Sequence, residues 1–117
     1  MTIEIYHNPS CSKSRQALQL LRDRNIEPRI IAYLETPPNA GELRALLRKL
    51  GLRPTDIMRT GEATFKDARD EIGAMSDDAR LQWLAAHPEV IQRPIVVNGE
   101  RARIGRPPES VLGLLPR

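Results

Sequence analysis

Hydrophobic and polar residues at the start of the chain change from one period to another and back. Ile3 and Ile5 alternate with polar residues, which is typical of a strand with one buried face. Apolar residues then recur at helical spacing over residues 12–24, with Asn25 as the expected C-cap, and residues 29–33 form a second β-type run. A strand, a helix and a strand in this order form a right-handed unit, so we predict that the two strands are parallel neighbours.

The middle of the chain keeps a helical period. Asn39 followed by Glu42 is the pattern of a capping box, and the leucines after it recur at helical spacing as far as Gly51. Shorter helical pieces are predicted after this helix, separated by Gly61, Gly73 and Pro88: residues 54–58, 64–72 and 76–86. We expect these helices to cover one face of the sheet, with Trp83 as a core contact rather than a cofactor contact.

The C-terminal part of the sequence returns to the period of strands. Asn98-Gly99 separates two β-type runs within residues 93–104, which is a strong signal for a hairpin of antiparallel strands. Gly105 breaks the second run, and Pro107 opens a last helix. Three residues of this helix are expected to face inward: Val111, Leu112 and Leu115.

The order of these elements predicts an α/β protein with a thioredoxin-like fold, in which a four-stranded mixed sheet carries a helical insertion between strand 2 and strand 3. A chain of 117 residues fits one core, and neither a repeat nor a long linker divides it, so we expect a single domain over residues 1–117. In this layout a proline at the start of the third strand faces the cysteine through a cis peptide bond. Pro94 occupies that position.

Charge and composition narrow the class of partner. Eighteen Lys and Arg residues against 15 Asp and Glu give a net charge of +3, which favours an anionic ligand. One Trp, two Tyr and one Phe are too few for a base-stacking surface, and no basic run is present, so no nucleic acid is expected. The apolar runs are too short for a membrane span and we expect no charged-then-apolar leader, so we expect no membrane partner and a cytoplasmic location. A small oxyanion fits the modest excess of arginine better.

Cys11, the only cysteine, lies where the first strand gives way to the first helix. The polar residues around Pro9 suit a turn and an N-cap, which puts the sulfur at or within one residue of the helix start. Unpaired N–H groups and a partial positive charge favour a thiolate there, and they lower a cysteine pKa from about 8.5 to roughly 3.5–7.5. The alternative is a buried, unreactive cysteine. A single cysteine forms no internal disulfide, so a redox cycle requires a thiol from another molecule.

Short motifs in a fixed order resemble those of a known family. They are His7-Asn8-Pro9-Ser10-Cys11-Ser12-Lys13-Ser14-Arg15, Tyr33-Leu34-Glu35-Thr36-Pro37-Pro38, Arg59, His87-Pro88, Arg93-Pro94-Ile95-Val96-Val97 and Arg106-Pro107. In order and spacing they resemble the glutaredoxin-coupled arsenate reductases over nearly the whole chain. The resemblance implies reduction of arsenate to arsenite without a tightly bound cofactor, with glutathione as co-substrate and glutaredoxin as protein partner.

The resemblance also implies residue roles. Cys11 looks like the nucleophile that forms a covalent thioarsenate, and His7 like the residue that lowers the pKa of this cysteine. Arg59, Arg93 and Arg106 look like the oxyanion-binding arginines. Guanidinium groups suit that role because they are permanently charged and present paired donors to a tetrahedral oxyanion. For His7, a turn residue bonded to the backbone is an open alternative.

Two residues of the first helical turn are further candidates for substrate contact. Ser14 stands where a dithiol member of the fold has its second cysteine, and it is a candidate donor to Cys11. Arg15 has the alternative of pairing with an acid elsewhere. No metal site is expected, because His7 and His87 with one cysteine form no ligand spacing.

Two other functions stay open at this point. A glutathione-dependent thiol reductase on the same scaffold would need the cysteine but not the arginines. A non-catalytic interaction module, similar to the transcriptional regulators of this superfamily that bind RNA polymerase, typically carries a Cys-x-x-Cys switch, and Ser14 argues against it.

Overall fold

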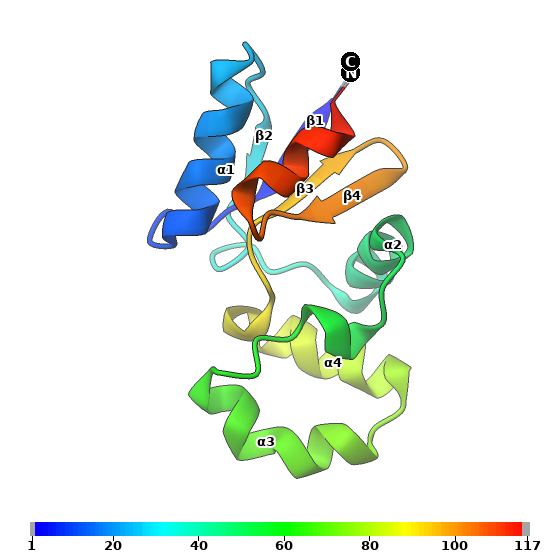
Figure 1. Ribbon diagram of the computed structural model, residues 1–117. Helices are drawn as coiled ribbons and strands as arrows, with labels where there is room; N and C mark the ends of the chain where they lie inside the picture. Colours follow the sequence, from blue (N-terminus) through cyan, green and yellow to red (C-terminus); the bar gives the residue numbers. More distant parts are fainter. Residues whose placement is uncertain (1, 116–117) are drawn as a thin grey trace. The chain divides into compact units, whose positions relative to one another are not determined.

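The computed structural model describes residues 2–115, which divide into two compact units. The first unit comprises Met1–Thr36 and Arg93–Arg117, and the second is Pro37–Gln92. The elements of the first unit are β1 (Ile3–Tyr6), α1 (Ser12–Asp23), β2 (Arg29–Ile31), β3 (Ile95–Asn98), β4 (Arg101–Ile104) and the 3₁₀ helix η3 (Pro108–Leu114) (Figure 1). The sheet is therefore assembled from both ends of the chain, and the expectation of a single domain stays a prediction.

The four strands form one mixed sheet in the order β2-β1-β3-β4. β1 is parallel to β2 and antiparallel to β3, and β3 and β4 are antiparallel to each other. These pairings confirm the predicted α/β architecture and its parallel first pair. β2 ends at Ile31, earlier than predicted, because the chain turns there and the N–H of Thr36 donates to the carbonyl of Ala32 at 2.9 Å.

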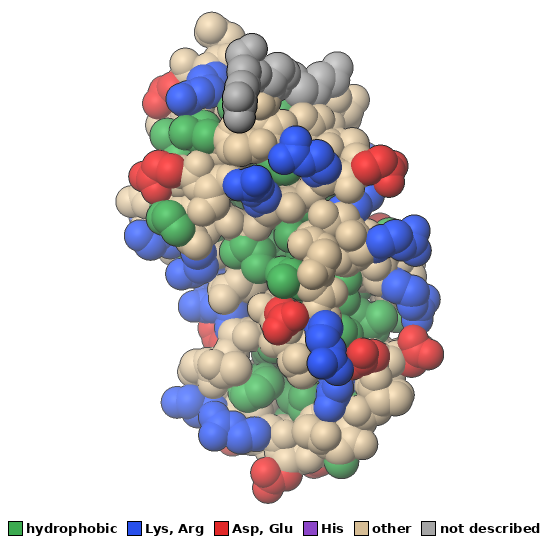
Figure 2. All heavy atoms as spheres, turned by 45° about the vertical axis from the view of Figure 1, so that its right-hand side comes forward, with side chains coloured by type: hydrophobic (Ala, Val, Ile, Leu, Met, Phe, Trp, Pro, Cys, Tyr) green, Lys and Arg blue, Asp and Glu red, His purple; other side chains and the backbone are tan. Residues whose placement is uncertain are grey.

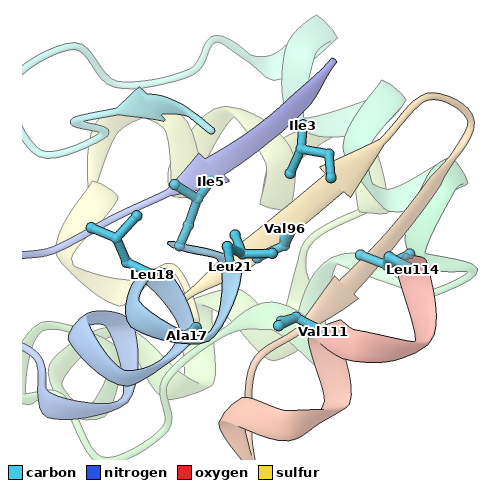
Figure 3. Packing of buried hydrophobic residues seen from close by; sticks show 8 residues of the cluster. All are labelled: Ile3, Ile5, Ala17, Leu18, Leu21, Val96, Val111 and Leu114. Carbon is cyan, nitrogen blue, oxygen red and sulfur yellow. The ribbon is translucent and has the colours of Figure 1, made fainter. Parts of the chain in front are cut away.

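One face of the sheet is covered by α1 and η3 (Figure 3). The buried cluster between them consists of Ile3, Ile5, Ala17, Leu18, Leu21, Val96, Val111 and Leu114. Because a 3₁₀ helix has about three residues per turn, Val111 and Leu114 share the inner face of η3. The expectation that Leu112 faces inward was wrong, since it assumed the period of an α-helix and Leu112 is only half-buried. Leu115 packs against the cluster with part of its surface, as expected.

Two turn positions lie one residue away from the predicted ones. Asn98 is still the last paired residue of β3, so the turn of the hairpin consists of Gly99 and Glu100. Gly99 has a φ of 62°, which a glycine adopts at little cost. At the end of α1 the C-cap is Arg24, and Asn25 follows it with a φ of 59°. The antiparallel hairpin is thus confirmed, and both turns are corrected by one residue.

The second unit is helical. Its elements are α2 (Ala40–Leu50), the 3₁₀ helix η1 (Pro54–Ile57), α3 (Ala63–Ala74), α4 (Asp77–Ala86) and the 3₁₀ helix η2 (Pro88–Val90). The capping box of Asn39 and Glu42 is present, and Gly51 ends α2 with a φ of 70°, as predicted. Gly73 lies inside α3, so its predicted place between two helices was wrong. A glycine inside a helix costs only about 1 kcal/mol, which the rest of a helix offsets.

Leucines of α2 and α4 form much of the buried surface of the second unit. They are Leu43, Leu46, Leu47, Leu81 and Leu84. Trp83, which was expected in the core, is half-buried, and its ring stacks on the ring of His87 with 4.3 Å between the centroids. The expectation that these helices cover one face of the sheet stays a prediction.

On the face that Figure 2 shows, Lys and Arg side chains are interspersed with Asp and Glu. One exposed ion pair joins Arg44 to Asp78 at 3.0 Å. Within residues 2–115, none of the helices has the length and apolar character needed to cross a bilayer.

Candidate active site

Cys11 is the N-cap of α1. Its φ of −95° and ψ of 122° are extended, and its carbonyl accepts a helical hydrogen bond from the N–H of Arg15 at 3.0 Å. This confirms the predicted position at the helix start. The side chain is partly exposed, and the backbone N–H groups of Lys13 and Ser14 donate to its sulfur. The sulfur is therefore accessible, and it faces the donors of a helix N-terminus.

Buried polar groups hold the loop that precedes Cys11. The carbonyl of Asn8 accepts the N–H of Cys11 at 3.0 Å, and Asn8 Oδ1 accepts the N–H of Ser10 at 2.9 Å. The N–H of Asn8 donates to Ser14 Oγ at 3.0 Å, and the same oxygen lies 2.6 Å from His7 Nδ1. His7, Asn8 and Ser14 are all buried. The position of Cys11 therefore depends on this hydrogen-bond network.

Asn8 was not among the predicted site residues, and Ser14 donates to Cys11 as predicted, through its backbone N–H. Asn8 forms an Asx-turn with the backbone two residues on, and the Asn-Pro pair at the start of the loop is the signal that points to it. The Ser14 hydroxyl bonds to His7 and Asn8, whereas its backbone N–H contacts the sulfur. A substrate contact of Ser14 stays a prediction.

Two of the three predicted arginines lie at Cys11. Arg106 Nη2 lies 3.6 Å from Cys11 Sγ, and Arg106 Nε donates to the carbonyl of Arg93 at 2.8 Å. The side chain of Arg93 also forms a hydrogen bond with the sulfur. The Arg93–Pro94 peptide is cis, as predicted, and Arg106–Pro107 is a second cis peptide that was not predicted. The first unit thus brings two cations from the C-terminal part of the chain to the thiol.

The pKa of Cys11 lies below the ordinary value of a cysteine. Partial burial raises it, but the N–H of Ser14 and the side chain of Arg93 lower it, because both favour the thiolate. The N–H of Lys13 and the charge of Arg106 act in the same direction. The thiolate fraction at neutral pH therefore exceeds that of a free cysteine.

The pKa of His7 is also lowered, first by burial and further by the charges of Arg22 and Arg15. The imidazole is therefore neutral at neutral pH. Its Nδ1 bonds to the side chain of Ser14 rather than to the backbone. The predicted role of His7 in lowering the pKa of Cys11 stays a prediction.

Arg15 and Arg59 bond to other groups. Arg15 Nη1 donates to the carbonyl of Pro9 at 2.9 Å, which closes the loop around Cys11. Arg59 belongs to the second unit, where its Nη1 lies 3.0 Å from Glu62 Oε1. Roles of Arg15 and Arg59 in binding substrate are untested predictions.

This geometry suits a small oxyanion. The guanidinium groups of Arg93 and Arg106 and the N–H groups at the start of α1 meet at a partly exposed thiol. Such donors bind an anion and place it against the nucleophile. Among residues 2–115, no three His, Cys, Asp or Glu side chains are grouped as a metal site.

Residues 6–114 match the sequence model of the ArsC family. The chain belongs to the ArsC family. The arsenate reductase of Haemophilus influenzae is 40% identical over 116 residues, which are 98% of this chain and 100% of that relative. An uncharacterized relative from Escherichia coli is 44% identical over 114 residues, which are 97% of this chain and 96% of its own.

The fold of this ArsC protein is shared with solved structures. An arsenate reductase from Vibrio cholerae matches it with a TM-score of 0.94 and 47% identity, over 98% of both chains. The predicted thioredoxin-like fold and the resemblance to arsenate reductases are thereby confirmed, whereas the coupling to glutaredoxin stays a prediction.

Proposed function

We propose that this ArsC protein reduces arsenate to arsenite, with Cys11 as the nucleophile. The observation that carries the proposal is the 3.6 Å contact between Arg106 Nη2 and Cys11 Sγ at the N-terminus of α1. It puts a permanent positive charge beside a thiol whose pKa is lowered, where an oxyanion has both donors and a nucleophile. The relatives from Haemophilus influenzae and Vibrio cholerae carry the name arsenate reductase, which supports the same substrate.

The first step joins the thiolate to arsenic. Arg93, Arg106 and the N–H groups of α1 hold the arsenate oxygens and offset the repulsion between two anions. Each charge-assisted hydrogen bond contributes about 1.5–3 kcal/mol. A lone pair of Cys11 Sγ then forms a bond to As(V), and one arsenate oxygen leaves as water after taking up protons from the medium. Arsenic keeps its oxidation state in this step.

Two electrons must then come from outside the chain, because Cys11 is its only cysteine. In the proposed sequence the glutathione thiol bonds to arsenic as a second water leaves, and a glutaredoxin thiolate then attacks the glutathione sulfur. The bonding pair of the cleaved S–As bond stays on arsenic, which becomes As(III), and a glutathione–glutaredoxin disulfide departs. Water cleaves the remaining S–As bond and releases arsenite and the Cys11 thiol.

Since the thiols of glutathione and glutaredoxin are kept reduced in the cytoplasm, we propose that the protein acts there.

The test is arsenite formation by the purified protein with arsenate, glutathione and glutaredoxin. The complete system is expected to turn over, and Arg93→Ala with Arg106→Ala is expected to abolish arsenate turnover because the oxyanion donors are lost. Arg24→Ala is a control for the loss of a surface arginine, since it removes one positive charge from the exposed C-cap of α1, about 20 Å along the helix. Absence of arsenite while the Cys11 thiol stays reactive would contradict the proposal.

The same variants distinguish a thiol reductase from an arsenate reductase. A glutathione mixed disulfide carries no tetrahedral oxyanion, so its reduction by Cys11 does not depend on paired guanidinium groups. Reduction of such a disulfide that survives the loss of both arginines, with no arsenate turnover in the parent protein, would favour the thiol reductase.

A further inference from the structure

Gly105 lies between the end of β4 and Arg106. Ile104 is paired with Ile95 in the β3–β4 ladder, and the N–H of Gly105 extends this pairing by donating to the carbonyl of Pro94 at 2.8 Å. Gly105 is buried. The backbone that leads into Arg106 is therefore held against the backbone that leads out of Arg93.

A side chain at position 105 has no room. A Cβ built on Gly105 would lie 2.7 Å from Pro94 Cγ, 3.4 Å from Pro94 Cδ and 3.3 Å from Val111 Cγ1. Neither neighbour is the free end of a flexible side chain, because the Pro94 ring is bonded to its own backbone and Val111 is 0% exposed. An added methyl group would therefore push the chain at 105 and 106 away from Pro94.

Such a displacement acts directly on the thiol. Arg106 Nε donates to the carbonyl of Arg93 at 2.8 Å, and Arg106 Nη2 reaches Cys11 Sγ at 3.6 Å. This hydrogen bond to sulfur is already long, so a small displacement of Arg106 weakens it. We propose that Gly105 is a positioning residue of the ArsC site, whose missing side chain lets β4 end against Pro94 so that Arg106 reaches Cys11. The link to arsenate turnover rests on the proposed function, but the link between Gly105, Arg106 and the thiol does not.

The test is the pH dependence of Cys11 alkylation by iodoacetamide in Gly105→Ala, which reports the thiolate without any turnover. Loss of an opposite charge near a thiolate raises its pKa, so alkylation at a pH below the pKa is expected to slow by about threefold or more. If Gly105 serves packing alone, the substitution lowers the melting temperature and leaves this pH profile unchanged. The profile therefore separates positioning from packing, and it stays informative if the protein does not reduce arsenate.

Gly113→Ala is the matched control. A Cβ at Gly113 would meet Arg103 Nη1 at 2.5 Å, but Arg103 is exposed and its guanidinium can swing aside. The control therefore introduces the same methyl group at a close contact in the same unit, and the alkylation profile is expected to match that of the parent protein. A Gly113→Ala profile shifted as far as that of Gly105→Ala would overturn the proposal, because the effect would then be general.

A double-mutant comparison tests whether Gly105 acts through Arg106. Added to Arg106→Ala, Gly105→Ala is expected to change the alkylation profile no further, since the charge it displaces is already gone. An additive change, or an unaltered profile in Gly105→Ala itself, would overturn the proposal.

If Gly105→Ala does not fold, Gly105→Ala with Val111→Ala is compared with Val111→Ala alone. The 2.7 Å contact with Pro94 persists there, so slower alkylation is again expected, and equal rates would contradict it.

Discussion

The nucleophile and its cationic partners are held in different ways. The loop that carries Cys11 is held by hydrogen bonds between near neighbours in sequence, such as His7 with Ser14, seven residues apart. Arg106 is 95 residues from Cys11 in sequence, and hydrogen bonds to the backbone of Arg93 and Pro94 hold its segment. The thiol is thus placed by local buried polar groups, and its charge partners are placed by strand pairing.

This difference separates stability from activity. The loop contains buried polar groups whose partners cannot be removed without leaving a donor or acceptor unsatisfied, which destabilises the folded state. The side chain of Arg93 is half-buried and that of Arg106 is exposed, so loss of their guanidinium groups leaves few buried groups unpaired. Substitutions in the Cys11 loop are therefore expected to lower the stability of the protein, and substitutions of the arginines are expected to lower its activity.

The largest effect is expected on activity, from the loss of an arginine that contacts the thiol. Arg106→Ala removes the donor at 3.6 Å from the sulfur and one charge for the oxyanion, so kcat/KM for arsenate is expected to fall by about 10–100-fold. The melting temperature should change little, because the loop keeps all of its contacts. Steady-state kinetics and a thermal melt on the same preparation check both statements. An inactive but also strongly destabilised protein would show that the two sides are not separable.

The opposite outcome is expected for Ser14→Ala on the loop side. It leaves the N–H of Asn8 and the Nδ1 of His7 without their partner, which is expected to cost about 1–3 kcal/mol of the free energy of unfolding. Activity of the folded fraction should fall less than in Arg106→Ala, since the backbone N–H at position 14 still reaches the sulfur. Urea unfolding measures the cost, with Ser12→Ala as an exposed control in the same turn. An unchanged free energy of unfolding would remove the structural role given to Ser14.

The smallest effect is the pH dependence of stability that Cys11 contributes. Its pKa is lower in the folded protein than in the unfolded chain, so the folded state favours the thiolate. This contribution is fully present above the unfolded pKa and is lost as the pH falls through the folded pKa. The free energy of unfolding of the parent protein minus that of Cys11→Ser should therefore rise with pH across this window. A difference that stays flat with pH would contradict it, and Arg106→Ala should make the rise shallower.

Most of the fold could be predicted because its signals are local. Asn39 and Glu42 identify a helix start by hydrogen bonds within one turn, and alternation at Ile3 and Ile5 identifies a half-buried strand. The predictions that failed needed a conformation that periodicity does not report. Leu112 was placed inward on the assumption of an α-helix, and Gly73 was read as a break although α3 runs through it.

The candidate site divides in the same way. The place of Cys11 at the start of α1 follows from the order of a strand, a polar loop and a helix, and the structure agrees. Asn8 was missed although the Asn-Pro pair indicates its Asx-turn, because its buried hydrogen bond to Ser14 depends on the folded loop. The approach of Arg106 to Cys11 was suggested by a family resemblance rather than by the residues themselves, because strand order and register decide which distant side chains meet.

Local sequence is enough to specify the strands, the helices and a cysteine with the polar setting of a helix N-terminus, because hydrogen bonding and hydrophobic period act over one or two turns. Tertiary structure alone decides that two arginines reach the sulfur and that residue 105 has room for no side chain. The reason is geometric, since the space beside Pro94 exists only after β4 has paired with β3 and η3 has packed Val111 against them.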